Sequence, residues 1–201
     1  MAWKIERWLS QLYPGDNSCL TTPYAKLTPR EFVVVACSTL DAGVAEVIAL
    51  RLRDDPKEVE DLLGADGDGR APVGSFGARI QLAYLLGLLN KTQAQGFRAL
   101  KNLRNVMAHR VMVDLTCSDA QRCLEPIRAH WQRLVASENH MFEALKPLID
   151  DSRRSEKAAM RMLRFHFSLC QIALRQVHDR MERLEAIDEI LLGQGRRRTR
   201  S

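Results

Sequence analysis

Apolar residues recur at spacings of three and four positions along most of this 201-residue chain, and they alternate with polar residues almost nowhere. That period places apolar side chains on one face of a helix, whereas a half-buried strand has a period of two. The pattern therefore predicts an all-α protein, an antiparallel helical bundle with an added long C-terminal helix. We expect the bundle to span residues 1–150, the long helix 151–192 and a disordered basic tail 193–201.

Capping and turn signals divide the bundle into separate helices. Thr28-Pro29-Arg30-Glu31 combines a capping threonine, a proline at the first helical position and a glutamate at the third. Ser75 and Thr92 are the expected caps of two further helices joined by a tight turn at residues 90–92. Ser118–Gln121 is the expected capping box of the next helix, which Pro126 bends or breaks. The predicted helices span residues 2–12, 28–53, about 57–63, 75–89, 93–109, 118–134 and 137–149, with 110–116 extended.

The long C-terminal helix has a single apolar seam. Its members, at three- and four-residue spacing, run from Met160 to Leu191. Such a seam either packs along the bundle or pairs with a second copy of the chain in a dimer. Gly193 and Gly195 are expected to end this helix.

Asp41 lies at the edge of the apolar stripe of the helix that begins near Thr28. A buried, unpaired carboxylate is energetically costly, so this side chain needs a cationic partner. We expect a structural ion pair between Asp41 and Arg79, with Arg104 as the alternative partner.

One helix ends in residues that can act on a phosphodiester. Arg104-Asn105-Val106-Met107-Ala108-His109 supplies a permanent forked cation, an amide and a group that titrates near neutral pH. Asn105 and His109 are four apart and share a face, whereas Arg104 and His109 lie roughly 140° apart around the axis. Arg104 and His109 therefore reach one phosphate only at a helix end, or in a cleft that a second element or subunit completes. The plainer interpretation is a surface helix end whose dipole favours a cation.

The charge distribution points to an anionic partner. Residues 1–152 contain 18 basic and 19 acidic residues, and the remainder contains 12 and 6. The stretch from Gly69 to Val113 has seven cations and no aspartate or glutamate. Nucleic-acid phosphate is the natural partner of such a stretch, and Arg79, Lys101 and Arg110 are the candidate contacts. Solvated helix faces are the alternative explanation, above all for Lys91 and Lys101.

The remaining composition excludes several classes of protein. The five cysteines are odd in number and scattered, which argues for reduced thiols in the cytoplasm and against a disulfide framework or zinc site. Charged residues within the first thirteen positions argue against a signal peptide, and the longest uncharged apolar run is too short to span a bilayer. We therefore expect a cytoplasmic protein without a metal or cofactor.

Two segments resemble a known family. Residues 104–109 resemble the R-N-x-x-x-H signature of the HEPN superfamily (higher eukaryotes and prokaryotes nucleotide-binding). Residues 73–88, Val-Gly-Ser-Phe-Gly-Ala-Arg-Ile-Gln-Leu-Ala-Tyr-Leu-Leu-Gly-Leu, resemble the G-S-F-S-A-R-I-x-L-A-Y-x-L-G-L run of its mannitol-repressor-like (MltR-like) branch. The resemblance extends from about Thr28 to Leu134.

This resemblance implies a metal-independent endoribonuclease in which two subunits bring their motifs together at one cleft. His109 would be the general acid or base at the ribose 2′-hydroxyl, Arg104 would stabilise the charge of the phosphorane, and Asn105 would orient both. The need for a 2′-hydroxyl makes RNA the substrate. A homodimer, a toxin or defence role and a restraining protein partner such as an antitoxin are implied as well.

Two other functions are compatible with the same residues. The mannitol-repressor-like branch implies a non-catalytic regulator, or an RNA-binding or protein-interaction module. The sequence has no evident helix-turn-helix, so a transcriptional effect would work through partners. A structural oligomer in which Arg104 and His109 only hold an interface is the third possibility.

Overall fold

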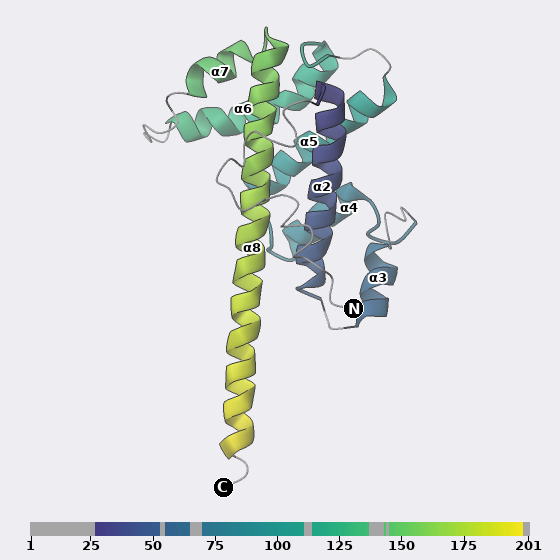
Figure 1. Ribbon diagram of the computed structural model, residues 1–201, viewed down its shortest axis with the longest axis vertical. Coiled ribbons are helices and arrows are strands. Elements are labelled where there is room, and N and C mark those ends of the chain that lie inside the picture. The colour runs from purple at the N-terminus through teal and green to yellow at the C-terminus, as the bar shows by residue number, and fades with distance from the viewer. Residues whose placement is uncertain are drawn as a thin grey trace.

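The computed structural model describes residues 27–52, 55–64, 70–110, 114–136, 143 and 145–198, and among them it contains seven helices and no strand (Figure 1). The all-α class predicted from the sequence is confirmed. The predicted helix over residues 2–12 lies outside the described residues. The helices are α2 (Pro29–Ala49), α3 (Pro56–Leu63), α4 (Phe76–Leu85), α5 (Lys91–His109), α6 (Ser118–Ala136), α7 (Lys146–Asp151) and α8 (Glu156–Arg198).

Helix α2 begins as predicted. The Thr28 hydroxyl accepts a hydrogen bond from the Glu31 amide, and the Glu31 carboxylate accepts one from the Thr28 amide at 2.8 Å. Pro29 occupies the first helical position, where its missing N–H costs nothing. The helix ends at Ala49 rather than near residue 53.

Helix α4 is shorter than predicted. It ends at Leu85 instead of Leu89, because Gly87 adopts a φ of 72° and turns the chain. A Cβ at Gly87 would meet no atom within 4 Å, so this glycine serves the turn and not a close helix approach. Tyr84, near the end of this helix, is 40% exposed.

Asn90, not Thr92, caps helix α5. The Asn90 side chain accepts a hydrogen bond from the Gln93 amide at 2.9 Å, and the Gln93 side chain accepts one from the Asn90 amide at 2.8 Å. This reciprocal pair satisfies two amides that the first helical turn leaves free. The predicted turn is therefore present, but its last residues already belong to the helix.

Helices α2 and α5 pack side by side in opposite directions. The Cys37 thiol donates to the Leu100 carbonyl at 3.3 Å, and Arg30 Nη2 donates to the Ala108 carbonyl at 3.4 Å. The start of α2 therefore lies beside the end of α5. The largest fully buried apolar side chains of the core include Trp131, Phe32, Phe97, Leu40, Ile48, Leu100, Leu103 and Met107.

Helix α6 starts differently from the prediction. The Asp114 carboxylate accepts hydrogen bonds from the Thr116 and Cys117 amides at 2.7 and 2.9 Å, which forms the turn before the helix. Residues 111–113 of the predicted extended segment lie outside the described residues. Ser118 does not form a capping box, because the Gln121 side chain donates to the Leu115 carbonyl instead. The helix continues through Pro126 without a break.

A buried guanidinium joins α6 to the turn between α7 and α8. Arg128 is fully buried, and its Nε donates to Ser152 Oγ at 2.9 Å. Its Nη2 donates to the Ser152 carbonyl at 3.2 Å and to the Gln121 side chain, and its Nη1 lies 3.3 Å from a Glu125 oxygen. Every guanidinium nitrogen thus has an acceptor, which a buried charge requires.

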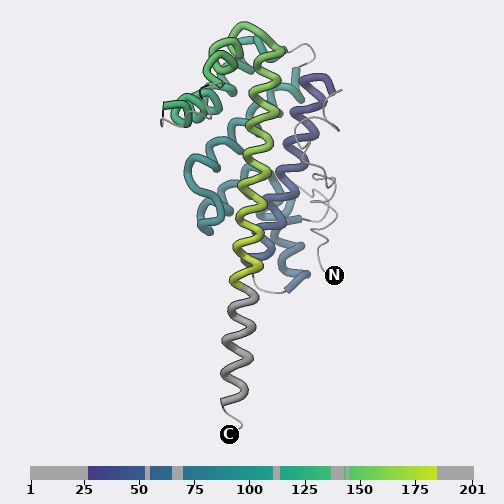
Figure 2. Tube along the Cα trace, turned by 60° about the vertical axis from the view of Figure 1, so that its left-hand side comes forward, coloured from purple at the N-terminus to yellow at the C-terminus, as the bar shows by residue number. Residues whose placement is uncertain are grey.

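Helix α8 runs along one side of the bundle (Figures 1 and 2). Its seam is buried from Met160 to Val177 and then becomes exposed, with Leu184 at 48%. This part of the seam therefore packs along the bundle, which is one of the two predicted arrangements. The prediction that this helix ends at Gly193 and Gly195 is wrong, because the helix continues to Arg198.

Replacing Arg128 by methionine should lower the free energy of unfolding by about 3 kcal/mol. The variant leaves the buried Ser152 and Gln121 oxygens without their donor. Urea unfolding followed by circular dichroism measures the loss. The matched control is Arg133→Met in the same helix, which removes an exposed arginine and should cost less than about 0.5 kcal/mol. Equal losses in the two variants would show that the buried hydrogen bonds contribute nothing.

Glu46 should make the protein less stable as the pH rises. This half-buried side chain makes no hydrogen bond or ion pair with any described residue, and burial raises its pKa from 4.5 to about 7. Between these values the folded state binds more protons than the unfolded state, so stability decreases with increasing pH. Glu46→Gln should therefore gain about 1–2 kcal/mol over wild type at about pH 8 and nothing at about pH 4. A gain that is the same at both values contradicts this explanation.

Candidate functional site

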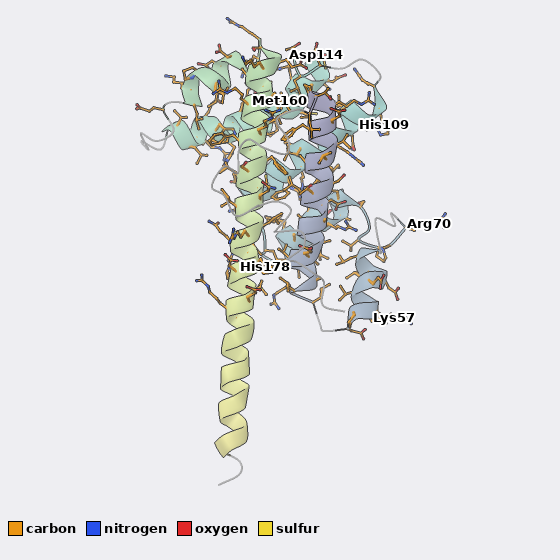
Figure 3. The ribbon with its side chains drawn as sticks, in the orientation of Figure 1. Lys57, Arg70, His109, Asp114, Met160 and His178 are labelled. Carbon is orange, nitrogen blue, oxygen red and sulfur yellow. The ribbon has the colours of Figure 1, made fainter. Side chains whose placement is uncertain are left out.

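The predicted motif lies on the last two turns of α5. Arg104 and His109 are exposed and Asn105 is half-buried. Figure 3 shows His109 at the edge of the bundle. Among the described residues, no hydrogen bond or ion pair joins any two of these three side chains. The described chain therefore presents them on its surface and does not itself enclose them in a cleft.

Arg104 faces the adjoining surface of α2. Burial raises the pKa of the Cys37 thiol to about 12, and the positive charge of Arg104 opposes that rise. The same charge acts on Asp41, whose pKa is raised by burial and held down chiefly by its hydrogen bond to Arg79. Arg104 thus lies near α2, while His109 follows at the end of α5. The assignment of Arg104, Asn105 and His109 as catalytic residues stays a prediction.

The predicted ion pair between Asp41 and Arg79 is present. Arg79 Nη1 lies 2.7 Å from Asp41 Oδ1, and its Nε and Nη2 donate to the Val73 and Leu63 carbonyls at 3.1 and 2.7 Å. Arg79 is only 5% exposed. The prediction that it also contacts nucleic acid is wrong, because its guanidinium is buried and fully engaged inside the protein.

The other two predicted phosphate contacts lie at the surface. The half-buried Lys101 lies across Gly77 of α4, with its Nζ 3.4 Å from the point where a Cβ on that glycine would stand. Arg110 forms an ion pair with Asp119, which also binds Arg122 at 3.1 Å. Both cations can therefore be reached by a phosphate, although Lys101 already packs on Gly77 and Arg110 is already paired with Asp119.

A basic groove that the sequence did not predict lies between α5 and α6. Its volume is 490 Å³, and three arginines, Arg98, Arg122 and Arg133, line it without any carboxylate. Arg133 Nε donates to the Ala129 carbonyl at 3.2 Å, and Arg98 makes no hydrogen bond or ion pair with a described residue. The remaining lining residues are Gln95, Ala99, Asn102, Cys123, Pro126 and Ala129. We call this feature the arginine groove.

The sequence did not reveal the arginine groove, because two of its three arginines, Arg122 and Arg133, lie on α6, beyond the carboxylate-free stretch of residues 69–113. Arg122 and Arg133 are eleven residues apart, which is close to three helical turns, so they share a face of α6. This shared face is what the sequence could indicate. A groove follows only from the packing of α6 on α5, which places Arg98 in the same lining as Arg122 and Arg133.

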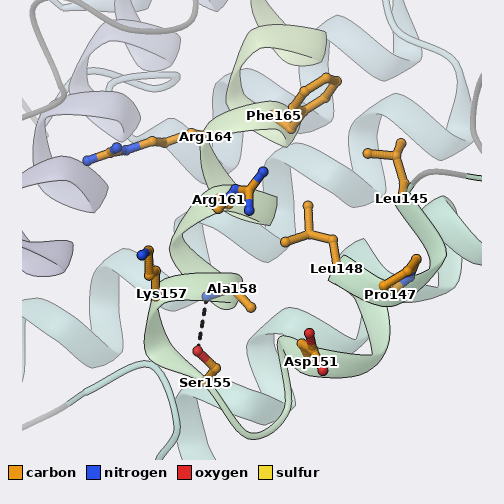
Figure 4. A pocket seen from close by; sticks show the side chains of 10 residues that line it. All are labelled: Leu145, Pro147, Leu148, Asp151, Ser155, Lys157, Ala158, Arg161, Arg164 and Phe165. Atoms are coloured by element: carbon orange, nitrogen blue, oxygen red, sulfur yellow. Dashed lines mark hydrogen bonds between the residues drawn. The ribbon is translucent and has the colours of Figure 1, made fainter.

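A second cavity, of 680 Å³, lies between α7 and α8 (Figure 4). Leu145, Leu148 and Phe165 contribute apolar side chains to its lining, and Lys157, Arg161 and Asp151 contribute charged ones. Figure 4 shows Arg164 extending away from Leu148, and its guanidinium carbon lies 5.8 Å from the centre of the Phe32 ring. Three basic side chains, Lys157, Arg161 and Arg164, line this opening against one acidic side chain, Asp151, so its lining is net positive.

One group of described residues has side chains of metal-ligating type close together. It consists of His178, Asp179 and Glu182 on α8. His178 Nδ1 lies 3.8 Å from Asp179, and its Nε2 lies 3.7 Å from Glu182. Because the two ring nitrogens point in different directions, one ion cannot use both contacts. We assign no metal site to this group.

Helix α2 is the one described helix that is long and apolar enough to cross a membrane. In its most apolar stretch, 56% is buried inside the bundle. The core helix of a globular protein has the same length and composition, so the feature is weak evidence for a membrane span.

Comparisons with known proteins give a distant relationship. No family model matches the sequence, and no solved structure matches it. The chain is 26% identical over 105 residues to the mannitol operon repressors of Escherichia coli K12 and of Escherichia coli O6:H1. The match covers 52% of this chain and 54% of each relative, so the chain spans about half the length of the curated relatives it matches. Membership of the HEPN superfamily stays a prediction, and a distant similarity to mannitol operon repressors is what these comparisons establish.

Proposed function

We propose that this protein is a non-catalytic regulator that acts by binding RNA, rather than an endoribonuclease. The observation that carries this proposal is the similarity to two proteins named as operon repressors. It favours the regulator that the sequence offered as an alternative. No comparison points to a nuclease.

The arginine groove supports binding through phosphates. A guanidinium matches the geometry of a phosphate with two parallel hydrogen bonds, and Arg98 has all its donors available for this. Arg122 and Arg133 are separated by about 16 Å along α6 at 1.5 Å per residue. That distance suits a run of phosphates along a strand better than a single anion.

The groove lining favours contact with the phosphate backbone rather than with the bases. It contains no aromatic side chain on which a base could stack. Binding should therefore depend strongly on salt and weakly on sequence. Arg110, which shares Asp119 with Arg122, and His109 would extend the basic surface toward the end of α5. Two copies of the chain in the predicted homodimer would double this surface.

Removing the groove arginines should weaken RNA binding. We expect the triple variant Arg98→Gln, Arg122→Gln, Arg133→Gln to bind a fluorescein-labelled single-stranded RNA at least about tenfold more weakly than wild type. The slope of log affinity against log salt should decrease by about 2, because three phosphate contacts are lost. Fluorescence anisotropy over a salt series measures both quantities, with a DNA strand of the same sequence as a comparison.

The matched control removes the same charge elsewhere. Arg154, Arg161 and Arg180 are exposed on the α7–α8 side of the molecule, and their triple glutamine variant should keep the salt slope of wild type. Equal weakening in both triple variants would mean that net charge, and not the groove, drives binding. Absence of RNA binding by wild type would overturn the proposed function.

The purified protein should leave RNA intact in the presence of a metal chelator. The described chain offers one exposed imidazole and no enclosed acid–base pair at the end of α5, and general acid–base catalysis depends on such geometry. Gel analysis of incubated RNA, with His109→Ala and Arg104→Ala beside wild type, tests this. Products with a cyclic phosphate that appear with wild type and disappear in both variants would restore the ribonuclease hypothesis.

A further inference from the structure

The cavity between α7 and α8 has a lining that is partly apolar and partly basic (Figure 4). Its volume of 680 Å³ lies within the size range of small-molecule sites. Leu145, Leu148 and Phe165 are half-buried, so they keep apolar surface in contact with solvent. Covering such surface with a ligand is favourable, because it removes apolar area from water. The lining therefore favours a ligand with an apolar part.

Contacts inside the protein hold the walls of this cavity in place. The buried Arg128 fixes the turn between α7 and α8, because its Nε donates to Ser152 Oγ at 2.9 Å. Phe165 packs edge-to-face on the buried Trp131, with the ring centres 5.6 Å apart. A turn and a side chain that are already ordered lose little freedom when a ligand binds. This part of the lining is therefore preorganised for binding.

Two cations of the lining have no partner within the described part of the chain. Lys157 and Arg161 are exposed, and neither makes a hydrogen bond or ion pair with a described residue. They are four residues apart on α8, so they share one face of the helix and repel each other. The third lining cation, Arg164, extends toward the Phe32 ring instead (Figure 4). An anion beside Lys157 and Arg161 would relieve their repulsion.

The balance of charge at the opening fits a ligand with one negative charge. Lys157 and Arg161 carry two positive charges, and Asp151 of the same lining carries one negative charge. Asp151 makes no ion pair with a described residue. With Arg164 turned toward α2, the excess is one positive charge. A single carboxylate neutralises this excess, whereas a phosphate dianion would leave an excess of negative charge near Asp151.

We propose that the cavity between α7 and α8 binds a small amphipathic carboxylic acid, with one carboxylate and an apolar chain. Lys157 and Arg161 donate hydrogen bonds to the carboxylate, and the chain covers Leu148 and Phe165. The proposal is independent of RNA binding, because the arginine groove lies between α5 and α6 and shares no lining residue with this cavity.

Three probes test the proposal on the full chain, each below the concentration at which it forms micelles. Octanoate has the chain and the charge, 1-octanol lacks the charge, and acetate lacks the chain. We expect calorimetry to show octanoate binding at least about tenfold more tightly than either of the others, because only octanoate combines both interactions. From butanoate to octanoate the affinity should increase by about three- to fourfold per methylene.

Two double variants test the role of the unpaired cations. Lys157→Gln, Arg161→Gln should remove the preference for octanoate over octanol, and both positions are exposed, so the fold should be kept. The matched control, Arg154→Gln, Arg180→Gln, removes two exposed arginines that do not line the cavity and should leave the affinity unchanged. Circular dichroism checks that both variants are folded. Nuclear Overhauser contacts between the octanoate chain and the Phe165 ring should place the ligand in this cavity.

Three results would overturn the proposal. They are octanol binding as tightly as octanoate, equal weakening of octanoate binding in the two double variants, and absence of contacts to the Phe165 ring. A lipid surface is the other source of such a ligand. If octanoate does not bind, and wild type associates with phosphatidylglycerol vesicles in a manner that only Lys157→Gln, Arg161→Gln abolishes, then the same cations serve a membrane and the proposal is wrong.

Discussion

A buried guanidinium must have an acceptor for every nitrogen, and this constraint fixes both ends of the bundle. At one end Arg79 binds Asp41 on α2, the carbonyl that ends α3 and the turn before α4. At the other end Arg128 binds Ser152 in the turn before α8 and Gln121 at the start of its own helix. Neither arginine can move without leaving donors and acceptors unpaired in the interior. Helix α5 packs between these two fixed ends.

The packing of α5 on α6 shapes two hollows of opposite character. One face of this helix pair carries the arginine groove, and the other, beneath α8, carries a cavity of 350 Å³ whose lining has no aspartate, glutamate, lysine or arginine. The small side chains at the contact, such as Ala99 and Ala129, let the two helices approach each other. The same two helices therefore present one charged face and one uncharged face.

The sequence predicted those parts of the fold that rest on local rules. The Thr28 cap follows from three residue types in fixed order, and the Asp41–Arg79 pair follows from a carboxylate on an apolar stripe. Arg128 carried the same signal, since it lies between Leu124 and Trp131 on the buried face of α6, but its acceptors come from a distant turn that no local pattern indicates.

Other differences arise because apolar content alone does not fix a helix end. Leu86, Leu88 and Leu89 continue the apolar pattern of α4, yet the positive φ of Gly87 ends the helix before them. Along α8 the buried apolar positions likewise end at Val177 among the described side chains, although the apolar pattern of the sequence continues. At Gly87 the residue type decides where the helix ends, whereas along α8 the number of neighbouring helices decides which residues are buried.

The three motif residues at the end of α5 do not form an enclosed site within one described chain. Arg104 and His109 are five residues apart on one helix, so their side chains leave the axis in different directions. Arg104 adjoins Cys37 and Asp41 on α2, and His109 is exposed beyond it. One imidazole and one guanidinium so placed attract an anion, but proton transfer to both sides of a phosphodiester needs groups on both sides of it. Unless a second subunit completes that arrangement, such a surface would serve the recognition of phosphates and not their cleavage, as the proposed function requires.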